Sequence, residues 1–209
     1  MYAPAIQKPM TFEEFLAWDD GSGRSFELRD GFPMPISDPN AKHEDVADKL
    51  CRKLEDHCED FSLPYLPKRQ KQVFVGRNPD TDKEESRKAD IVVFEKDEWE
   101  RMRQSSSSAA AYVVPPLIIE IVSSNWREDY EYKLDDYEAL GVPEYWTVDY
   151  AGLGGVRFIG KPKQPTITVY QLTEEGEYQP KQFRGDDLIE SSILGNLNLT
   201  ANQIFAVGR

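Results

Sequence analysis

Two carboxylates stand in apolar stretches that otherwise predict buried strands. Asp90 lies within residues 89–94 and Glu120 within residues 117–122, and most of their neighbours are aliphatic. An ionised carboxylate is costly to bury unless a counter-ion or a metal compensates its charge, and two of them on neighbouring strands repel each other. Mg²⁺ or Mn²⁺ takes one or two carboxylates together with water and substrate phosphate. The pair therefore predicts a divalent metal site, with simple capping or ion pairing of strand-end carboxylates as the alternative.

A lysine follows on the next predicted helix. Four residues share one face of that helix by their spacing: Trp126, Tyr130, Lys133 and Tyr137. From this face the Lys133 ammonium can fold back toward Glu120. Two carboxylates and a lysine are the residue types needed for metal-assisted phosphodiester hydrolysis, because the metal activates water and the lysine neutralises developing charge. The alternative is that Lys133 pairs with Asp129 or Asp136 on a solvated helix face.

The first part of the chain predicts helices around a hairpin. Thr11 begins a capping box with Glu14 and predicts a short helix after it. The Asp30-Gly31 pair is a hairpin turn signal between two short strands. Asn40 caps a helix that we expect to reach Cys58, since its apolar residues recur every three or four positions.

The middle of the chain predicts the strands that carry the two carboxylates. The expected strands cover residues 61–66, 72–75, 89–94, 117–122 and 144–150, and a helix over residues 126–140 joins the last two. Short β segments follow. These elements predict an α/β or α+β fold, a sheet with helices packed on it. We expect a single domain over residues 1–209, with a core over about 11–150 and a β-rich C-terminal extension over about 151–209.

Composition excludes several classes of protein. The most apolar stretch, residues 109–122, is interrupted by two prolines and a glutamate, and so predicts no transmembrane helix. The first residues lack the pattern of a secretory signal. Cys51 and Cys58 lie seven apart in a predicted helix, too far for an unstrained disulfide. Two free thiols indicate a reducing compartment, so we expect a cytoplasmic protein.

Charge limits the kind of nucleic-acid contact the chain could make. The formal net charge of −13 argues against a general nucleic-acid coat. A local site is still compatible, because screening confines exposed charges to about 8 Å at physiological salt. Residues 68–103 hold ten of the 25 basic residues against nine acidic ones, which is a mild basic asymmetry.

These residues together resemble a known family. The matching segments are Ala89-Asp90, Glu120 to Ser124, Asp129 with Lys133 and Tyr137, Gly141 to Asp149, Phe26 to Gly31, and His43. This set is similar to the Uma-type restriction-endonuclease family of the PD-(D/E)XK nuclease superfamily, over about residues 11–205. Glu144-Tyr145-Trp146, in its Gly-Val-Pro context, is the most specific piece.

The resemblance implies a restriction-endonuclease-like core, with a mixed central sheet flanked by helices and a divalent-metal site at one edge. It implies that Asp90 and Glu120 are metal ligands, with the carbonyl of Ile121 as the third. Lys133 would replace the motif lysine, and Glu27 would help to position metal or water.

The chain departs from the motif at two positions. Ala89 stands where the motif has proline, and Val122 stands two residues after Glu120, where the motif has lysine. The family commonly shifts that lysine to the next helix, and Lys133 is the matching position.

The resemblance implies a Mg²⁺- or Mn²⁺-dependent endodeoxyribonuclease that hydrolyses DNA, with a homodimer as the expected assembly for cutting both strands. A catalytically inactive interaction module that keeps the nuclease fold and acts as a homodimer is the alternative. The two cysteines and the histidines His43 and His57 do not have zinc-site spacing. His43, at the start of its helix, can lie near the acidic site.

Overall fold

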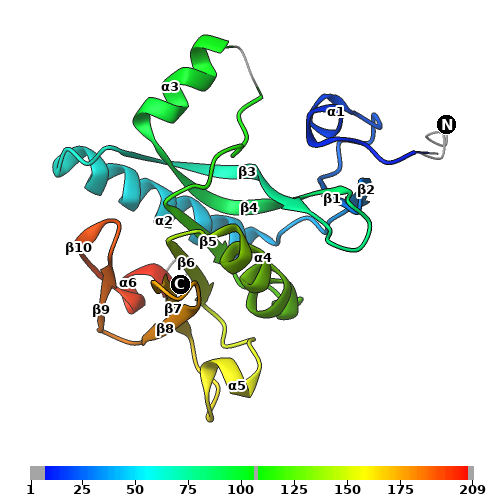
Figure 1. Ribbon diagram of the computed structural model, residues 1–209. Coiled ribbons are helices and arrows are strands. Elements are labelled where there is room, and N and C mark those ends of the chain that lie inside the picture. The colour runs from blue at the N-terminus through cyan, green and yellow to red at the C-terminus, as the bar shows by residue number, and fades with distance from the viewer. Residues whose placement is uncertain (1–7, 106–107, 207–209) are drawn as a thin grey trace.

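A six-stranded mixed sheet forms the centre of the computed structural model, which describes residues 8–105 and 108–206 (Figure 1). The strands of this sheet, in spatial order, are β3 (Tyr65–Arg77), β4 (Glu84–Glu95), β5 (Leu117–Ile121), β6 (Glu144–Asp149), β7 (Thr166–Leu172) and β8 (Tyr178–Phe183). β5 and β6 are parallel, and the other neighbours are antiparallel. The predicted strand–helix–strand unit is therefore present at the centre of the sheet.

Helices and two small hairpins surround this sheet. The helical elements are α1 (Phe12–Ala17), α2 (Ala41–Asp60), α3 (Lys96–Ser105), the π-helical turn η1 (Glu128–Tyr132), α4 (Lys133–Leu140), α5 (Val156–Ile159) and α6 (Ala201–Phe205). The hairpins are β1 (Phe26–Arg29) with β2 (Phe32–Pro35), and β9 (Leu188–Ser191) with β10 (Gly195–Thr200). The mixed α+β architecture confirms the expected fold class.

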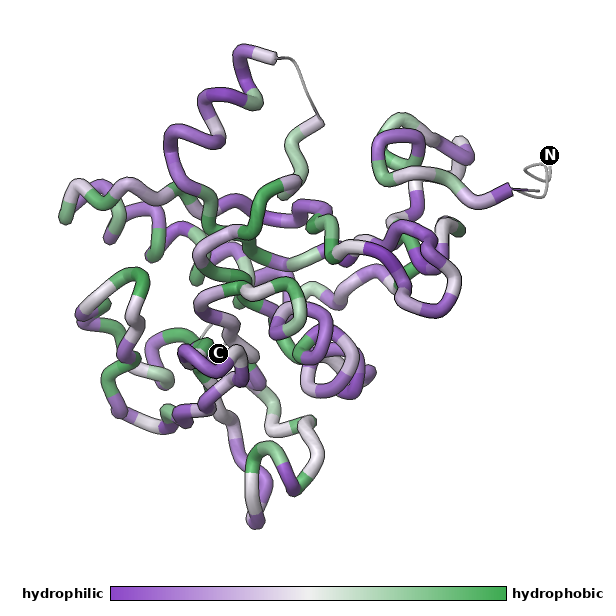
Figure 2. The backbone as a smooth tube through the Cα atoms, in the orientation of Figure 1, coloured by the Kyte–Doolittle hydropathy of each residue, from purple (hydrophilic) through white to green (hydrophobic). Residues whose placement is uncertain are grey.

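Each face of the sheet has its own apolar core. On one face, α2, α6 and the β9–β10 hairpin pack against side chains of β4 to β7. On the other face, η1, α4, α5 and α3 cover the alternate side chains. Figure 2 shows hydrophobic residues gathered along the central strands, whereas α3 is mostly hydrophilic. The central strands are therefore buried on both sides, as the apolar runs predict.

The local signals at the N-terminal end are confirmed. Thr11 and Glu14 form the reciprocal capping box, and Asn40 Oδ1 accepts a hydrogen bond from the His43 amide at 3.0 Å. Asp30 and Gly31 have φ values of 51° and 76° at the hairpin turn. A Cβ on Gly31 would lie 2.5 Å from Pro9 Cβ, so this turn requires glycine for space as well as for conformation.

Two features of the middle region differ from the predictions. In place of the separate strands expected at residues 61–66 and 72–75, the structure has one long strand of 13 residues, β3, which begins at Tyr65 and pairs with β4. Its central basic residues interrupt the apolar pattern because β3 is an edge strand, where Arg69 pairs with Glu44 and Asp48 of α2. Helix α3 was not predicted, since it presents few apolar residues. Beyond residue 150, β7 and β8 continue the central sheet.

Glu144 ties the C-terminal hairpin to the sheet. This side chain is fully buried at the start of β6. Its Oε1 accepts hydrogen bonds from Trp146 Nε1 at 2.7 Å and Ser191 Oγ at 2.6 Å, and its Oε2 accepts from the amide and hydroxyl of Ser192, each at 2.7 Å. The glutamate of the most specific sequence segment is thus a structural anchor.

Replacing Glu144 by alanine would leave these donors without an acceptor inside the protein. We expect the free energy of unfolding, measured by urea denaturation, to fall by about 3 kcal/mol. Glu174→Ala, at an exposed position between β7 and β8, is the matched control and should change it by less than about 0.5 kcal/mol. Similar losses in both variants would contradict the anchoring role.

Candidate active site

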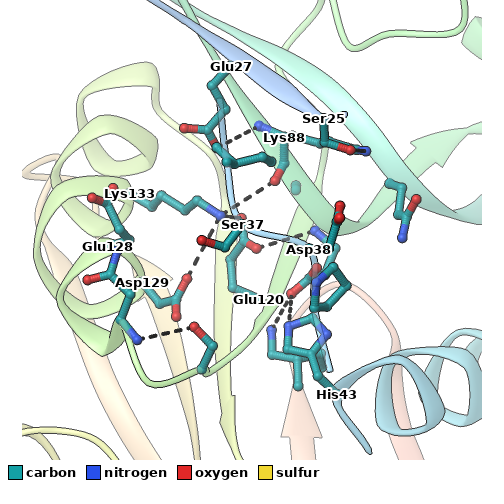
Figure 3. A pocket seen from close by; sticks show the side chains of 18 of the residues that line it. Ser25, Glu27, Ser37, Asp38, His43, Lys88, Glu120, Glu128, Asp129 and Lys133 are labelled. Atoms are coloured by element: carbon teal, nitrogen blue, oxygen red, sulfur yellow. Dashed lines mark hydrogen bonds and ion pairs between the residues drawn. The ribbon is translucent and has the colours of Figure 1, made fainter. Parts of the chain in front are cut away.

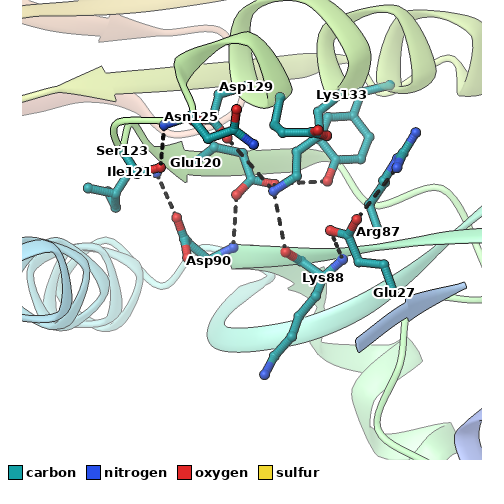
Figure 4. A network of polar contacts seen from close by, with 12 residues as sticks. Glu27, Arg87, Lys88, Asp90, Glu120, Ile121, Ser123, Asn125, Asp129 and Lys133 are labelled. Carbon is teal, nitrogen blue, oxygen red and sulfur yellow. Dashed lines mark hydrogen bonds and ion pairs between the residues drawn. The ribbon is translucent and has the colours of Figure 1, made fainter. Parts of the chain in front are cut away.

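The site lies where β4 and β5 part. Their ladder runs from Val93↔Leu117 to Ile91↔Ile119 and stops there. Beyond this point, Asp90 Oδ2 accepts a hydrogen bond from the Ile121 amide at 2.8 Å, and the Asp90 amide donates to Glu120 Oε2 at 3.3 Å. Figure 4 shows these two contacts bridging the strands. Side chains thus replace the backbone ladder, which fixes both carboxylates at the gap.

The backbone of β3 is also irregular opposite this gap. Register places Gln70 between the pairs Arg69↔Ile91 and Lys71↔Ala89, and so opposite Asp90. Gln70 has a φ of 53°, in the left-handed region that costs a residue with a Cβ about 1–2 kcal/mol. Backbone strain of this kind gathers at functional sites, where surrounding structure enforces it.

Lys133 points into the cluster. Its Nζ lies 3.0 Å from Glu120 Oε1 and 3.8 Å from Asp129 Oδ1, and its side chain is 10% exposed. Tyr137, one turn later, donates its hydroxyl to the same Glu120 oxygen at 2.9 Å. Asp136 pairs instead with Arg87. The sequence left the direction of Lys133 open, and the structure turns it toward Glu120 rather than toward a solvated face.

The turn before α4 explains how consecutive helical turns bring both the Asp129 carboxylate and the Lys133 ammonium to the site. η1 is π-helical over five residues, and Asp129 within it is buried together with Lys133. A π-helical turn accommodates an extra residue and is frequent at functional sites. The turn directs Asp129 and Lys133 to the sheet side, where both line the pocket (Figure 3).

Burial and charge shift the pKa values of the cluster in opposite directions. Burial raises the pKa of Glu120 well above its ordinary value, and burial raises that of Asp129 to about 7. Burial lowers the pKa of Lys133, but the charges of Glu120 and Glu27 outweigh burial and raise it overall. The pKa of Asp90 is lowered, since the His43 hydrogen bond and charge outweigh its burial. The cluster holds more negative than positive groups and favours an added cation.

Glu27 and His43 complete the walls of the site. Glu27 Oε1 accepts from the Lys88 amide at 3.1 Å, and its Oε2 lies 3.1 Å from Arg29 Nη2 and 3.5 Å from Arg87 Nη1. Its charge acts on Lys133 without a direct ion pair among the contacts of the described residues. His43 Nε2, from the first turn of α2, lies 3.1 Å from Asp90 Oδ2.

These side chains surround one pocket of about 740 Å³ (Figure 3). The predicted residues Glu27, Asp90, Glu120, Ile121 and Lys133 all line it. Asp129 and His43 also line it. The sequence resemblance included both residues but implied no catalytic role for either. Arg87 and Gln70 were missed: nothing in the apolar pattern marks Arg87, and the positive φ of Gln70 has no glycine or asparagine signal.

The available carboxylates fit an ion such as Mg²⁺, which completes its coordination with water and phosphate, better than a metal whose ligands all come from protein side chains. Within the ranges that the structure describes, no group of three or more His, Cys, Asp or Glu side chains is arranged to hold a metal. Mg²⁺ needs only one or two carboxylates, with water and phosphate supplying the rest. Asp90 and Glu120 offer two such carboxylates on the wall of the pocket. Cys51 and Cys58 are free and buried in α2 and take no part.

The buried charges make stability depend on pH. The raised pKa values of Glu120 and Asp129 contribute stability that is present below ordinary carboxyl pKa values and is lost as pH rises through the folded values, near 7 for Asp129. Lys133→Met removes the compensating cation. We expect a loss of about 3–5 kcal/mol in unfolding free energy at pH 8.

At pH 5 the loss for Lys133→Met should be clearly smaller, because Glu120 and Asp129 can take up protons. Urea unfolding at both pH values measures the difference, and Lys83→Met, at an exposed position between β3 and β4, is the control. A loss for Lys133→Met that is the same at both pH values would refute the proposed charge balance.

Comparisons with known proteins agree with this architecture. No described helix has the length and apolar character to cross a membrane. No curated protein matches the chain. Among solved structures, the chain is similar to one described as "a putative nuclease belonging to DUF820" from Anabaena variabilis ATCC 29413, with a TM-score of 0.69, 16% identity, and coverage of 95% of this chain and 98% of that one. The family model Uma2, described as "Putative restriction endonuclease", matches residues 12–202. The chain therefore belongs to the Uma2 family, in agreement with the resemblance of its sequence motifs.

Proposed function

We propose that this protein is a divalent-metal-dependent endonuclease that hydrolyses DNA phosphodiester bonds by the PD-(D/E)XK mechanism. The observation that carries the proposal is the buried Lys133 ammonium, 3.0 Å from Glu120 and beside the gap that Asp90 bridges. Membership of a family described as restriction endonucleases supports the same reaction. A catalytically inactive interaction module would have no need of a buried charge cluster around an open pocket, because burying charges costs desolvation free energy.

The carboxylates of Asp90 and Glu120 and the carbonyl of Ile121 would hold Mg²⁺ or Mn²⁺. The bound ion would supply an activated water and polarise the phosphate. Asp90 is suited to this role because its lowered pKa keeps it ionised. The pKa of Glu120 is raised by burial and only partly restored by Lys133, so a bound cation would favour its ionised, metal-binding form.

Lys133 would act as a fixed cation rather than as a base. Its raised pKa keeps the ammonium protonated at neutral pH, so it can orient a water or hydroxide and neutralise charge that develops on the phosphate. Tyr137 fixes the other side of this arrangement through Glu120 Oε1. Glu27, buried and clamped by two arginines, would keep Lys133 charged and aimed at the site.

The substrate would be DNA, and because the protein is acidic overall, DNA would bind it at a local site. Arg29 at the pocket wall and the buried Arg87 are already paired with acids, so the metal is the main positive charge that we expect to face the phosphate. Cutting both strands of a duplex would use two such sites, and we expect the protein to act as a homodimer.

Cleavage of supercoiled plasmid and short single-stranded DNA, with Mg²⁺ or Mn²⁺ at low salt, tests the function. We expect nicking by the wild-type protein. Asp90→Asn, which keeps the side-chain shape, should reduce the rate at least about a hundredfold, because it removes a charged ligand and transition-state stabilisation. Lys133→Ala should give a similar loss, and Lys133→Arg checks that a charge alone is insufficient.

The variants must show the wild-type circular dichroism spectrum for this comparison. Loss of cleavage in Asp90→Asn but not in Lys133→Ala would keep the metal site and exclude Lys133 from catalysis. Wild-type cleavage no greater than that of Asp90→Asn on every substrate would reject the nuclease and favour the interaction module.

A further inference from the structure

We propose that His43 is a ligand of the same metal ion as Asp90, and that the site therefore prefers Mn²⁺ to Mg²⁺. This inference rests on the proposed function, since it concerns the ion of that site. It adds a nitrogen donor to a site for which the sequence motif implies oxygen donors alone.

The first support is the distance between the two side chains. His43 Nε2 and Asp90 Oδ2 are 3.1 Å apart. Two donors that bind one octahedral ion at about 2.1 Å, at right angles, are about 3.0 Å from each other. The pair is therefore already spaced as neighbouring ligands. Without a metal, the same spacing gives the hydrogen bond that the structure shows.

The second support concerns Ile121, whose carbonyl is another proposed metal ligand and which lies beside the imidazole of His43. The Ile121 amide donates to Asp90 Oδ2 at 2.8 Å, the same oxygen that His43 Nε2 contacts, and Ile121 and His43 both line the pocket. The imidazole thus lies among the groups to which the metal role was assigned. Figure 3 shows the ring of His43 turned into the pocket from the start of α2.

The third support is how the ring is held. His43 is 5% exposed, and its Nδ1 is buried with no hydrogen-bond partner among the described residues. Nδ1 lies 3.9 Å from Glu44 Oε1. Metal-binding histidines almost always donate their second ring N–H to a carboxylate, carbonyl or water. Glu44, held by Arg69, is placed to become that partner after a small shift.

The donor set predicts the metal preference. Imidazole nitrogen is a common ligand of transition metals, whereas Mg²⁺ takes oxygen ligands. Mn²⁺ accepts both and suits a carboxylate-rich site. Asp90 and Glu120 remain the proposed carboxylate ligands, and the carbonyl of Ile121, water and phosphate would supply the other positions.

Metal binding by the 209-residue chain tests this without reference to cleavage. Isothermal titration with MnCl₂ and with MgCl₂ gives the two affinities, and pulsed electron paramagnetic resonance of bound Mn²⁺ detects coupling to an imidazole nitrogen. We expect tighter binding of Mn²⁺ by the wild type, with nitrogen coupling. His43→Ala should lose at least about tenfold in Mn²⁺ affinity and all nitrogen coupling, with a smaller change for Mg²⁺.

The chain has two histidines, so His57→Ala is the matched control. His57 contacts the carbonyl of Leu194 at the far end of α2, and its replacement should leave both affinities and the nitrogen coupling unchanged. His43→Asn, which can still donate to Asp90, replaces His43→Ala if that variant fails to fold, and it should also lose the nitrogen coupling.

Three results would overturn the inference. Equal losses for Mn²⁺ and Mg²⁺, without nitrogen coupling in the wild type, would show that His43 only positions Asp90. Unchanged Mn²⁺ affinity in both His43 variants would remove it from the site. Binding of neither metal by the wild type would reject the proposed function as well. Mn²⁺ binding with nitrogen coupling but no DNA cleavage would support the ligand and reject the nuclease.

Discussion

One buried ammonium group holds the site together. Lys133 lies within 4 Å of Glu120 and Asp129 and within the field of Glu27 and Asp90. Without it, carboxylates from three elements would be brought together in a low-dielectric interior, where their repulsion is strong. Three features stabilise Lys133 in this position: the π-helical turn before it, the Glu27 carboxylate held by two arginines, and the Tyr137 hydroxyl that donates to Glu120. The charge balance stays negative, which supports the proposed binding of a metal cation at this cluster.

The proposed cation site lies where the backbone pairing between β4 and β5 ends. β4 and β5 lose their ladder beyond Ile91, and Gln70 of β3, on the other side of β4, has a left-handed backbone conformation. Hydrogen bonds between Asp90 and its neighbours on β5 compensate for part of this loss. The apolar cores on the two faces of the sheet, and anchors distant from the site such as Glu144, stabilise the fold despite the backbone pairing that is still missing here.

Sequence reasoning found what short-range physics determines. The capping box of α1, the cap at Asn40 and the Asp30-Gly31 turn depend on neighbouring residues, and they were predicted correctly. Asp90, Glu120 and Lys133 stood out because charges interrupt apolar or amphipathic patterns. The continuous strand β3 was missed because its polar residues are satisfied by α2, far along the chain. The direction of Lys133 and the positive φ of Gln70 depend on the assembled sheet, which local patterns do not encode.

The most direct measurement of the central claim is anomalous scattering from Mn²⁺ in crystals of this protein grown with the metal. The account predicts one strong peak at the gap between β4 and β5, within ligand distance of Asp90 and Glu120, with Lys133 still paired to Glu120. Saturating Mn²⁺ that leaves no peak at this gap, while the Lys133–Glu120 pair is intact, would show that the buried lysine already completes the cluster and would contradict the account.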